Sequence, residues 1–184
     1  MGDPTQPPHL CVHCALTPSA VKEARAVGPY TGTLRSIVHA LKYDGRRSLA
    51  RPLGALMCEA GAPLIGACDV AVPVPLHARR RRERGFNQAT DLARQLGLPV
   101  VHALARTRHT HTQTALPATE RHANVTGAFR ATRHVRALAG TTVVLVDDVR
   151  TTGATLEACA VVLKDAGVRE VFALTAARVA TPRA

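Results

Sequence analysis

The sequence predicts an α/β fold in which a mainly parallel, twisted sheet is flanked by helices. Apolar segments with strand composition alternate along the chain with segments of helical period, which is typical of right-handed βαβ units. Hydrophobic residues make up 46% of the chain, which is enough for a packed core. Only 3% of the residues are aromatic, so that core depends on alanine, valine and leucine. The length of 184 residues suits one domain.

Each expected element follows from a local pattern. Leu34, Ile37, Val38 and Leu41 have the spacing of one helix face, in a helix that begins near residue 32. Further helices are expected at 48–59, 87–96 and 153–167. Strands are expected at 68–76, 98–101, 141–147 and 170–179. The segment 104–126 has no apolar period and predicts a long loop, a feature that often forms a functional lid.

Positive charge is concentrated in one part of the chain. The net charge is +11, and residues 79–136 contain twelve arginines against three acidic residues. Five of these arginines lie in HARRRRERGF, residues 77–86, which is predicted to be a loop between a strand and a helix. Such a field attracts nucleic acid or a ligand rich in phosphates. The alternative is that the arginines reflect a compositional bias and are simply solvated.

Several classes of protein are excluded by composition. No stretch is long and apolar enough to span a bilayer, so no membrane insertion is expected. The N-terminus lacks the basic-then-apolar pattern of a signal peptide. Five cysteines, an odd number at irregular spacings, do not indicate a secreted disulfide scaffold. These observations predict a cytoplasmic protein.

The stretch VVLVDDVRTTGAT, residues 143–155, places two acids and several small hydroxyl residues between a strand and a helix. In α/β folds, ligands bind beyond the carboxyl end of a strand, next to the N-terminus of the following helix. The free amides and the helix dipole favour an anion there, and Gly153 lets the backbone approach it closely. Asp147 and Asp148 cannot bind phosphate, but they suit sugar hydroxyls or a Mg²⁺ ion. The stretch therefore predicts a phosphosugar site.

Helix capping is the simpler explanation for threonine at this position. One cap uses one hydroxyl, and a capping box that ends at Glu157 needs serine or threonine where the chain has Ala154. Capping therefore leaves both acids and most of the threonines unexplained.

VVLVDDVRTTGAT resembles the motif with which type I phosphoribosyltransferases bind phosphoribosyl pyrophosphate (PRPP). The resemblance implies a type I phosphoribosyltransferase-like fold with a mobile hood loop. It also implies that Asp147 and Asp148 hold the ribose hydroxyls, together with Mg²⁺. The residues implied in binding the 5′-phosphate are Arg150, Thr151, Thr152, Gly153, Ala154 and Thr155.

Two positions depart from this motif. Purine-salvage members carry an aspartate, proposed to act on the base, at the position of Thr151, so the chemistry of that group is not supported. Arg150 stands where an apolar residue is more usual. No catalytic residue is assigned.

Other segments resemble one branch of this superfamily, the ComF competence-protein family. Residues 30–54, 69–89 and 106–129 are similar to its successive signatures, so the likeness covers about 30–179. Members of the family are implicated in the uptake and integration of transforming DNA, and their transferase activity is not generally established. The resemblance implies PRPP and DNA as partners, together with other DNA-uptake or recombination proteins.

Further candidate residues lie in the basic loop and in the expected hood. Arg79 and Arg84 are the best candidates for contacting pyrophosphate, because guanidinium groups bind phosphate bidentately. Arg80, Arg81 and Arg82 are candidates for binding single-stranded DNA. Gln113 and Arg121 are candidates for reaching the ligand when the hood closes. A solvated basic edge and an ordinary polar loop are the alternatives.

Residues 1–29 are expected to be an N-terminal segment in front of a domain at 30–184. Cys11 and Cys14 form one CxxC, whereas ComF proteins usually have a four-cysteine zinc finger in this region. A structural zinc site needs four ligands, so zinc binding by this chain is not expected. The pair is interpreted as the remnant half of a finger, at most a half-site.

Three functions are compatible with these features. The first is a PRPP-binding protein of DNA uptake that contacts single-stranded DNA. The second is an active phosphoribosyltransferase that transfers the 5-phosphoribosyl group to a nitrogenous acceptor in nucleotide metabolism. The third is a binding module that has lost its ligand, which the intact acid pair and threonine loop disfavour. Aromatic residues are few, so any DNA binding is expected to be electrostatic and independent of sequence.

Overall fold

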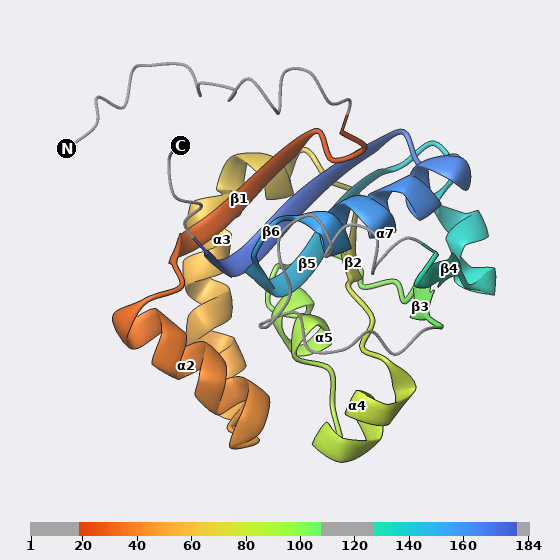
Figure 1. The fold of residues 1–184 in the computed structure, drawn as a ribbon. Helices are drawn as coiled ribbons and strands as arrows, with labels where there is room; N and C mark the ends of the chain where they lie inside the picture. The colour runs from red at the N-terminus through yellow and green to blue at the C-terminus, as the bar shows by residue number, and fades with distance from the viewer. Residues whose placement is uncertain (1–18, 108–126, 180–184) are drawn as a thin grey trace.

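A computed structural model describes residues 19–107 and 127–179 of the chain (Figure 1). Its main sheet has four parallel strands in the order β1-β6-β5-β2. These strands are β1 (Glu23–Pro29), β2 (Val70–Pro73), β5 (Thr142–Arg150) and β6 (Glu170–Arg178). A separate antiparallel pair consists of β3 (Leu104–Arg106) and β4 (Phe129–Ala131). The expected α/β fold with a parallel sheet is confirmed.

Helices cover both faces of the sheet. In the described part of the chain the α-helices are α2 (Gly32–Tyr43), α3 (Ala50–Gly66), α4 (Ala78–Arg84), α5 (Gln88–Ala93) and α7 (Ala154–Asp165). The same residues include two short 3₁₀ helices, η1 (Arg47–Leu49) and η3 (Arg133–Leu138). Figure 1 shows α7 on one face of the sheet and α3 on the other. Among the described residues, none of the helices is long and apolar enough to cross a membrane.

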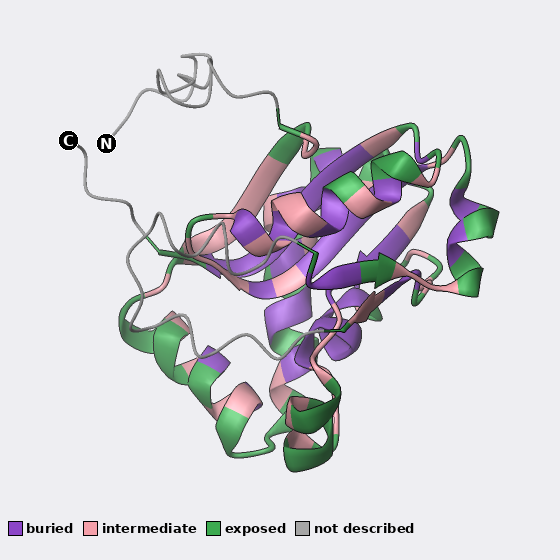
Figure 2. Ribbon diagram, turned by 45° about the vertical axis from the view of Figure 1, so that its right-hand side comes forward, coloured by how far each residue is buried: buried purple, intermediate pink, exposed green. Residues whose placement is uncertain are grey.

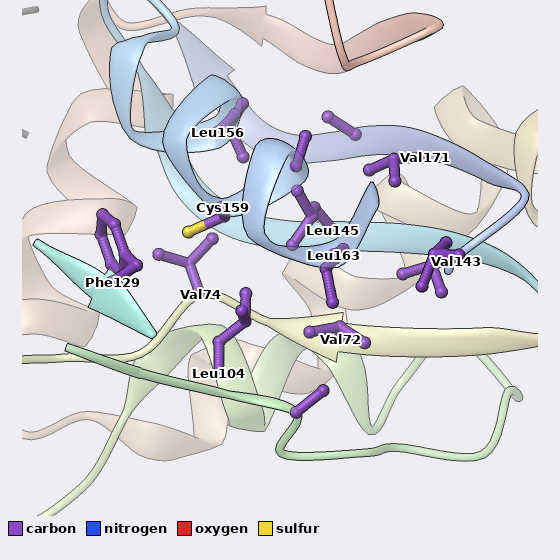
Figure 3. Close-up of a cluster of buried hydrophobic side chains, with 14 of the residues drawn as sticks. Val72, Val74, Leu104, Phe129, Val143, Leu145, Leu156, Cys159, Leu163 and Val171 are labelled. Atoms are coloured by element: carbon purple, nitrogen blue, oxygen red, sulfur yellow. The ribbon is translucent and has the colours of Figure 1, made fainter. Parts of the chain in front are cut away.

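Two apolar clusters form the core, one on each face. Val143 and Leu145 of β5 pack against α7, β3, β4 and η3 on the first face, and Figure 3 shows this cluster around Cys159 and Leu163. Val144 and Val146 pack against α2, α3 and α5 on the second face. Because side chains of a strand alternate between its faces, one buried strand supplies both clusters. Figure 2 shows this buried centre with exposed helix surfaces around it.

The structure differs from the sequence-based expectation at several elements. Residues 23–29 form the edge strand β1, although the domain was expected to begin at residue 30. The arginine-rich segment 77–86, expected to be a loop, contains helix α4. The expected strand at 98–101 is reduced to an isolated bridge between Ala71 and Val100. Strand β5 continues through both acids to Arg150, three residues further than expected.

Helix α3 approaches α5 closely at Gly54. A Cβ at this position would collide with the Cβ and Cγ atoms of Gln95, which lies just after α5. Gly66, at the end of the same helix, has open space at the corresponding point. The close approach of α3 to α5 therefore requires a residue without a side chain at position 54, and position 66 has no such requirement.

Gly54→Ala should lower the free energy of unfolding by about 1–2 kcal/mol, since overpacking outweighs the gain in helix propensity. Gly66→Ala in the same helix should be neutral or stabilising by up to about 1 kcal/mol. Urea unfolding of both variants measures the difference. Equal stabilities would contradict the close packing of α3 on α5.

Candidate phosphosugar site

The candidate site lies where two neighbouring strands diverge. Strand β2 pairs with β5 from Val70 to Pro73, and the amide of Val74 still donates to the carbonyl of Val146 at 2.9 Å. Beyond that point β5 continues to pair with β6, up to Arg150. The crevice outside the carboxyl ends of parallel strands is where α/β folds bind ligands. The acid pair, at positions 147 and 148, lies immediately after the divergence.

Strand alternation gives the two acids different surroundings. Asp148 lies on the face covered by α2 and α5, and its partners come from those helices. Asp147 continues the series of Val143 and Leu145, on the face covered by α7. Both carboxylates nevertheless line one cavity, because the neighbouring strand no longer covers them. The two carboxylates therefore lie in one crevice but have different neighbours.

Asp148 is buried and held by two donors. Its Oδ1 is 2.6 Å from the Nζ atom of Lys42 in α2. Its Oδ2 accepts a hydrogen bond from Nε2 of Gln88 in α5 at 2.5 Å. Burial disfavours the charge on Lys42, but the attraction of Asp148 outweighs this effect, so the pKa of Lys42 is raised. The carboxylate is thus tied to both helices.

The same chain of contacts continues to helix α4, which carries the arginines. Gln88 accepts a hydrogen bond through Oε1 from Nη1 of Arg84 at 2.6 Å. The guanidinium of Arg84 also lies 5.2 Å from the ring centre of Tyr43, at the end of α2. This network fixes the direction of Arg84 toward the crevice. It joins α2, α4, α5 and β5 at one point.

Asp147 is half-buried and carries fewer contacts. Its Oδ1 accepts a hydrogen bond from the amide of Asp148 at 2.8 Å. Burial and then the charge of Asp148 raise the pKa of Asp147 to about 7, against the opposing attraction of Lys42 and Arg106. A carboxyl group with such a pKa changes charge near neutral pH. Perturbed groups of this kind are concentrated at functional sites.

The turn after β5 brings backbone and hydroxyl groups to the crevice. Gly153 has a φ of 86°, in the left-handed region, and is the N-cap residue of α7. No side chain caps this helix through its N-cap residue. The Oγ1 atom of Thr152 accepts a weak hydrogen bond from the amide of Ala154 at 3.4 Å. The amino end of a 12-residue helix therefore opens toward the crevice, where it favours an anion.

Helices α4 and α5 are positioned by short polar contacts. The side chain of His77 accepts from the amide of Arg79 at 3.3 Å, and Gly85 ends α4 with a φ of 78°. Asn87 caps α5, because its Oδ1 accepts from the amide of Ala89 at 3.1 Å. Its Nδ2 donates to the carbonyl of Val74 at 3.0 Å, which ties α5 to the end of β2.

These elements enclose a cavity of about 380 Å³. Its lining combines the acid pair with basic residues from α2, α4, β3 and β5 and with residues of the turn at 151–155. From the sequence-predicted set it includes Asp147, Asp148, Arg80, Arg84, Arg150, Thr151, Gly153 and Thr155. Thr152 is exposed and Ala154 is buried, and neither lines the cavity.

The arginines of α4 are divided among different surroundings. Arg80 and Arg84 line the cavity. Arg79 does not line it, and its Nε lies 2.8 Å from Oε1 of Glu83 on the exposed side of the helix. Arg81 lines a separate cavity, and Arg82 is exposed. The helical period explains this division, because residues one apart on a helix point in different directions.

Four of the sequence-predicted residues lie outside the described residues. They are Gln113 and Arg121 of the expected hood and Cys11 and Cys14 of the expected half finger. Within 19–107 and 127–179, no group of three or more histidine, cysteine, aspartate or glutamate side chains is placed to hold a metal ion.

Sequence reasoning missed Lys42, Gln88 and Arg106. Each lines the cavity, and each is brought there by a contact between segments far apart in the chain. Gln88 is 60 residues from its partner Asp148. Arg106, in β3, is half-buried, and its pKa is lowered by burial and then by Arg80. No local sequence signal marks Gln88, because its burial at the start of α5 becomes visible only in the folded structure.

The fold and this crevice define the class of protein. The chain has a parallel strand that runs through two acids, followed by a threonine-glycine turn and a helix, and the family model of the phosphoribosyl transferase domain matches residues 82–183. The chain belongs to this superfamily and, within it, to the ComF family of competence protein F and DNA utilization protein YhgH.

Individual relatives support this assignment. DNA utilization protein YhgH of Salmonella typhi is 35% identical over 187 residues, which covers 92% of this chain and 77% of the relative. Competence protein F of Haemophilus influenzae is 30% identical over 171 residues, covering 88% and 75% of the two chains. Among solved structures, the allosteric regulatory enzyme of purine biosynthesis matches with a TM-score of 0.49 and 23% identity. That match covers 75% of this chain and 30% of the enzyme.

Asp147→Asn should stabilise the free protein at about pH 8. A carboxyl group whose pKa is higher in the folded chain than in the unfolded chain loses stability as the pH rises between the two values, here from about 4 to about 7. Asparagine removes this loss, so the melting temperature should rise by at least about 2–4 °C at pH 8.

At about pH 4 the two proteins should melt alike, because the carboxyl is then protonated in the folded state. Asp44→Asn, at an exposed position, is the matched control and should change the melting temperature little at either pH. Calorimetric scans that show no gain for Asp147→Asn at the higher pH would contradict the raised pKa.

Proposed function

We propose that this protein binds PRPP in the 380 Å³ cavity and acts in the handling of single-stranded DNA during natural transformation. The observation that carries the proposal is the convergence of an acid pair, the amino end of α7 and several arginines on one crevice. Sugar hydroxyls need acceptors and phosphates need donors, and the crevice offers both. The role in DNA uptake follows the names of the relatives.

Each part of PRPP has a matching surface in this proposal. The 5′-phosphate lies on the turn from Thr151 to Thr155, at the amino end of α7. The pyrophosphate lies toward Arg80 and Arg84, which face the crevice from α4. Arg79 is not included, because it pairs with Glu83 outside the cavity.

The acid pair is assigned unequal roles toward the ribose. Asp147 is the carboxylate that faces the ligand, since it is half-buried and its Oδ1 accepts from the backbone amide of Asp148, whereas Asp148 is buried against the ammonium group of Lys42. Asp148 is fixed by Lys42 and Gln88 and completes the hydroxyl-binding surface.

A Mg²⁺ ion fits this arrangement when PRPP is present. Magnesium prefers oxygen ligands and is commonly held by one or two carboxylates together with phosphate oxygens of the substrate. Asp147 would supply the protein oxygen, with Asp148 beside it. The ion would neutralise phosphate charge and align ribose and pyrophosphate.

Transfer of the phosphoribosyl group is the second candidate function. It is favoured by the family model of the phosphoribosyl transferase domain, which matches residues 82–183. The bond between C1 of the ribose and the pyrophosphate oxygen would break, a bond from C1 to an acceptor nitrogen would form, and pyrophosphate would leave. Release of pyrophosphate from PRPP, measured with a panel of nucleobases, tests this activity.

Asp147→Asn should weaken PRPP binding at least about tenfold, or about 1.4 kcal/mol, with Mg²⁺ present. The wild-type affinity should fall as the pH is lowered below about 7, because protonation removes the charge that binds Mg²⁺ or a hydroxyl. The variant should lose the part of this pH dependence that comes from Asp147, while the part that comes from the phosphate of PRPP, whose second pKa is about 6, should remain. Titration calorimetry of PRPP with and without Mg²⁺ measures both effects, and an unchanged affinity in the folded variant would remove Asp147 from the site.

Gly153→Val should abolish PRPP binding, because a side chain at the left-handed position displaces the turn that receives the phosphate. Gly140→Val is the matched control, since Gly140 also has a positive φ, 74°, but lies outside the cavity. Both variants carry similar backbone strain. If both retain or both lose PRPP while folded, the phosphate turn has been assigned wrongly.

A further inference from the structure

A second cavity, of about 540 Å³, lies next to the phosphosugar crevice. The two cavities share Pro75, Leu76 and Arg106 in their walls. Helix α4 contributes to both, with Arg80 and Arg84 lining the first and Arg81 lining the second. A ligand in the second cavity would therefore lie beside PRPP without occupying its site.

The charge of the second cavity differs from that of the first. Its lining contains Arg81, Arg133 and the shared Arg106, together with two histidines, and it contains no carboxylate. Arg81 and Arg133 are exposed, and among the described residues neither forms an ion pair. Other exposed arginines do, as Arg79 pairs with Glu83. The cavity therefore offers cations to an outside anion, without acceptors for sugar hydroxyls.

Two neutral polar side chains of this cavity, those of Asn87 and Thr132, are already engaged in the fold. Asn87 bonds the carbonyl of Val74 and the amide of Ala89. The hydroxyl of Thr132 donates to the carbonyl of His102 at 2.9 Å and accepts from the amide of His134 at 3.2 Å. A ligand in this cavity would consequently be recognised by its charged side chains, which bind phosphates. The lining includes no phenylalanine, tyrosine or tryptophan, so bases would not be stacked there.

We propose that the second cavity binds the phosphodiester backbone of single-stranded DNA, with Arg81 from α4 and Arg133 from η3 as the principal phosphate contacts. This proposal rests on the proposed function and gives its DNA contact a location. Two cations from separate elements suit two successive phosphates of a strand better than they suit a single small anion. A flexible single strand can enter a recess of this size, whereas a rigid duplex meets only its rim. In this proposal Arg80 contacts PRPP in the first cavity, and Arg82, which lines neither cavity, contacts neither ligand there.

Paired substitutions with equal charge changes test the location. Arg81→Ala with Arg133→Ala removes two arginines of the second cavity. Arg79→Ala with Arg136→Ala removes two exposed arginines that line neither cavity, from the same two helices α4 and η3. The net charge of the two variants is the same. Circular dichroism and melting curves check that both are folded.

The readout is the fluorescence anisotropy of a labelled oligothymidylate between about 50 and 200 mM salt. The cavity variant should lose about tenfold or more in affinity, and its log–log salt slope should flatten by about 1.4, or about 0.7 for each of two phosphates. The control variant should stay within about twofold of wild type, because Arg79 and Arg136 line neither cavity and Arg79 is already paired with Glu83. PRPP affinity should remain within about twofold in both variants, since these residues lie outside the first cavity.

Four results would overturn the proposal. Equal losses of DNA affinity in both variants would mean that DNA binding depends on the overall positive charge of the protein and not on this cavity. Loss of PRPP in the cavity variant would reassign Arg81 and Arg133 to the phosphosugar site. A duplex of the same sequence that binds as tightly, with the same dependence on Arg81 and Arg133, would exclude single-strand selection. Wild-type protein that binds PRPP but no DNA at about 50 mM salt would remove the DNA contact of the proposed function itself.

Discussion

The ion pair between Asp148 and Lys42 is the interaction on which the site depends. It lies at the carboxyl end of β5 and is nearly enclosed by α2 and α5. A buried carboxylate is costly unless it is paired and hydrogen-bonded, and here both of its oxygens have a donor. Removing either partner would leave the other charge buried without compensation. The pair thus links the position of α2 to the acidic end of the central strand.

This arrangement assigns different tasks to two adjacent acids. Strand geometry directs them to opposite faces, where one meets a lysine and a glutamine and the other meets a crevice. Asp148 orients Gln88, which in turn holds Arg84 at the cavity wall. Asp147 keeps a raised pKa because it is partly buried beside another carboxylate. The second carboxylate lowers the stability of the ligand-free protein, at a position where a ligand or Mg²⁺ would compensate its charge.

Much of the fold was predictable because its signals are local. Helix α2 was predicted from the spacing of Leu34, Ile37, Val38 and Leu41, and the structure places it at 32–43. The order of strand, turn and helix around Gly153 was equally clear, since a buried apolar run, a glycine and a helical period follow one another. The parallel sheet follows from the alternation of such units.

The remainder depends on contacts that the sequence does not display. Helix α4 has no buried residue and therefore no apolar period, so its arginines were interpreted as a loop. Strand β1 is a half-buried edge strand whose pairing with β6 spans most of the chain. Lys42 and Gln88 reach Asp148 only after three distant segments have folded together. Arg79 was preferred over Arg80, although the period of α4 turns Arg80 toward the crevice and leaves Arg79 with Glu83.

A crystal structure of the protein with PRPP and Mg²⁺ would show directly whether the crevice binds the phosphosugar. We expect the 5′-phosphate on the turn of Gly153, Asp147 at the ribose or the metal, and the bond between Lys42 and Asp148 intact. The second cavity should remain free of PRPP. Electron density for the phosphates away from that turn, or an Asp148 that leaves Lys42 to bind the ligand, would contradict this expectation.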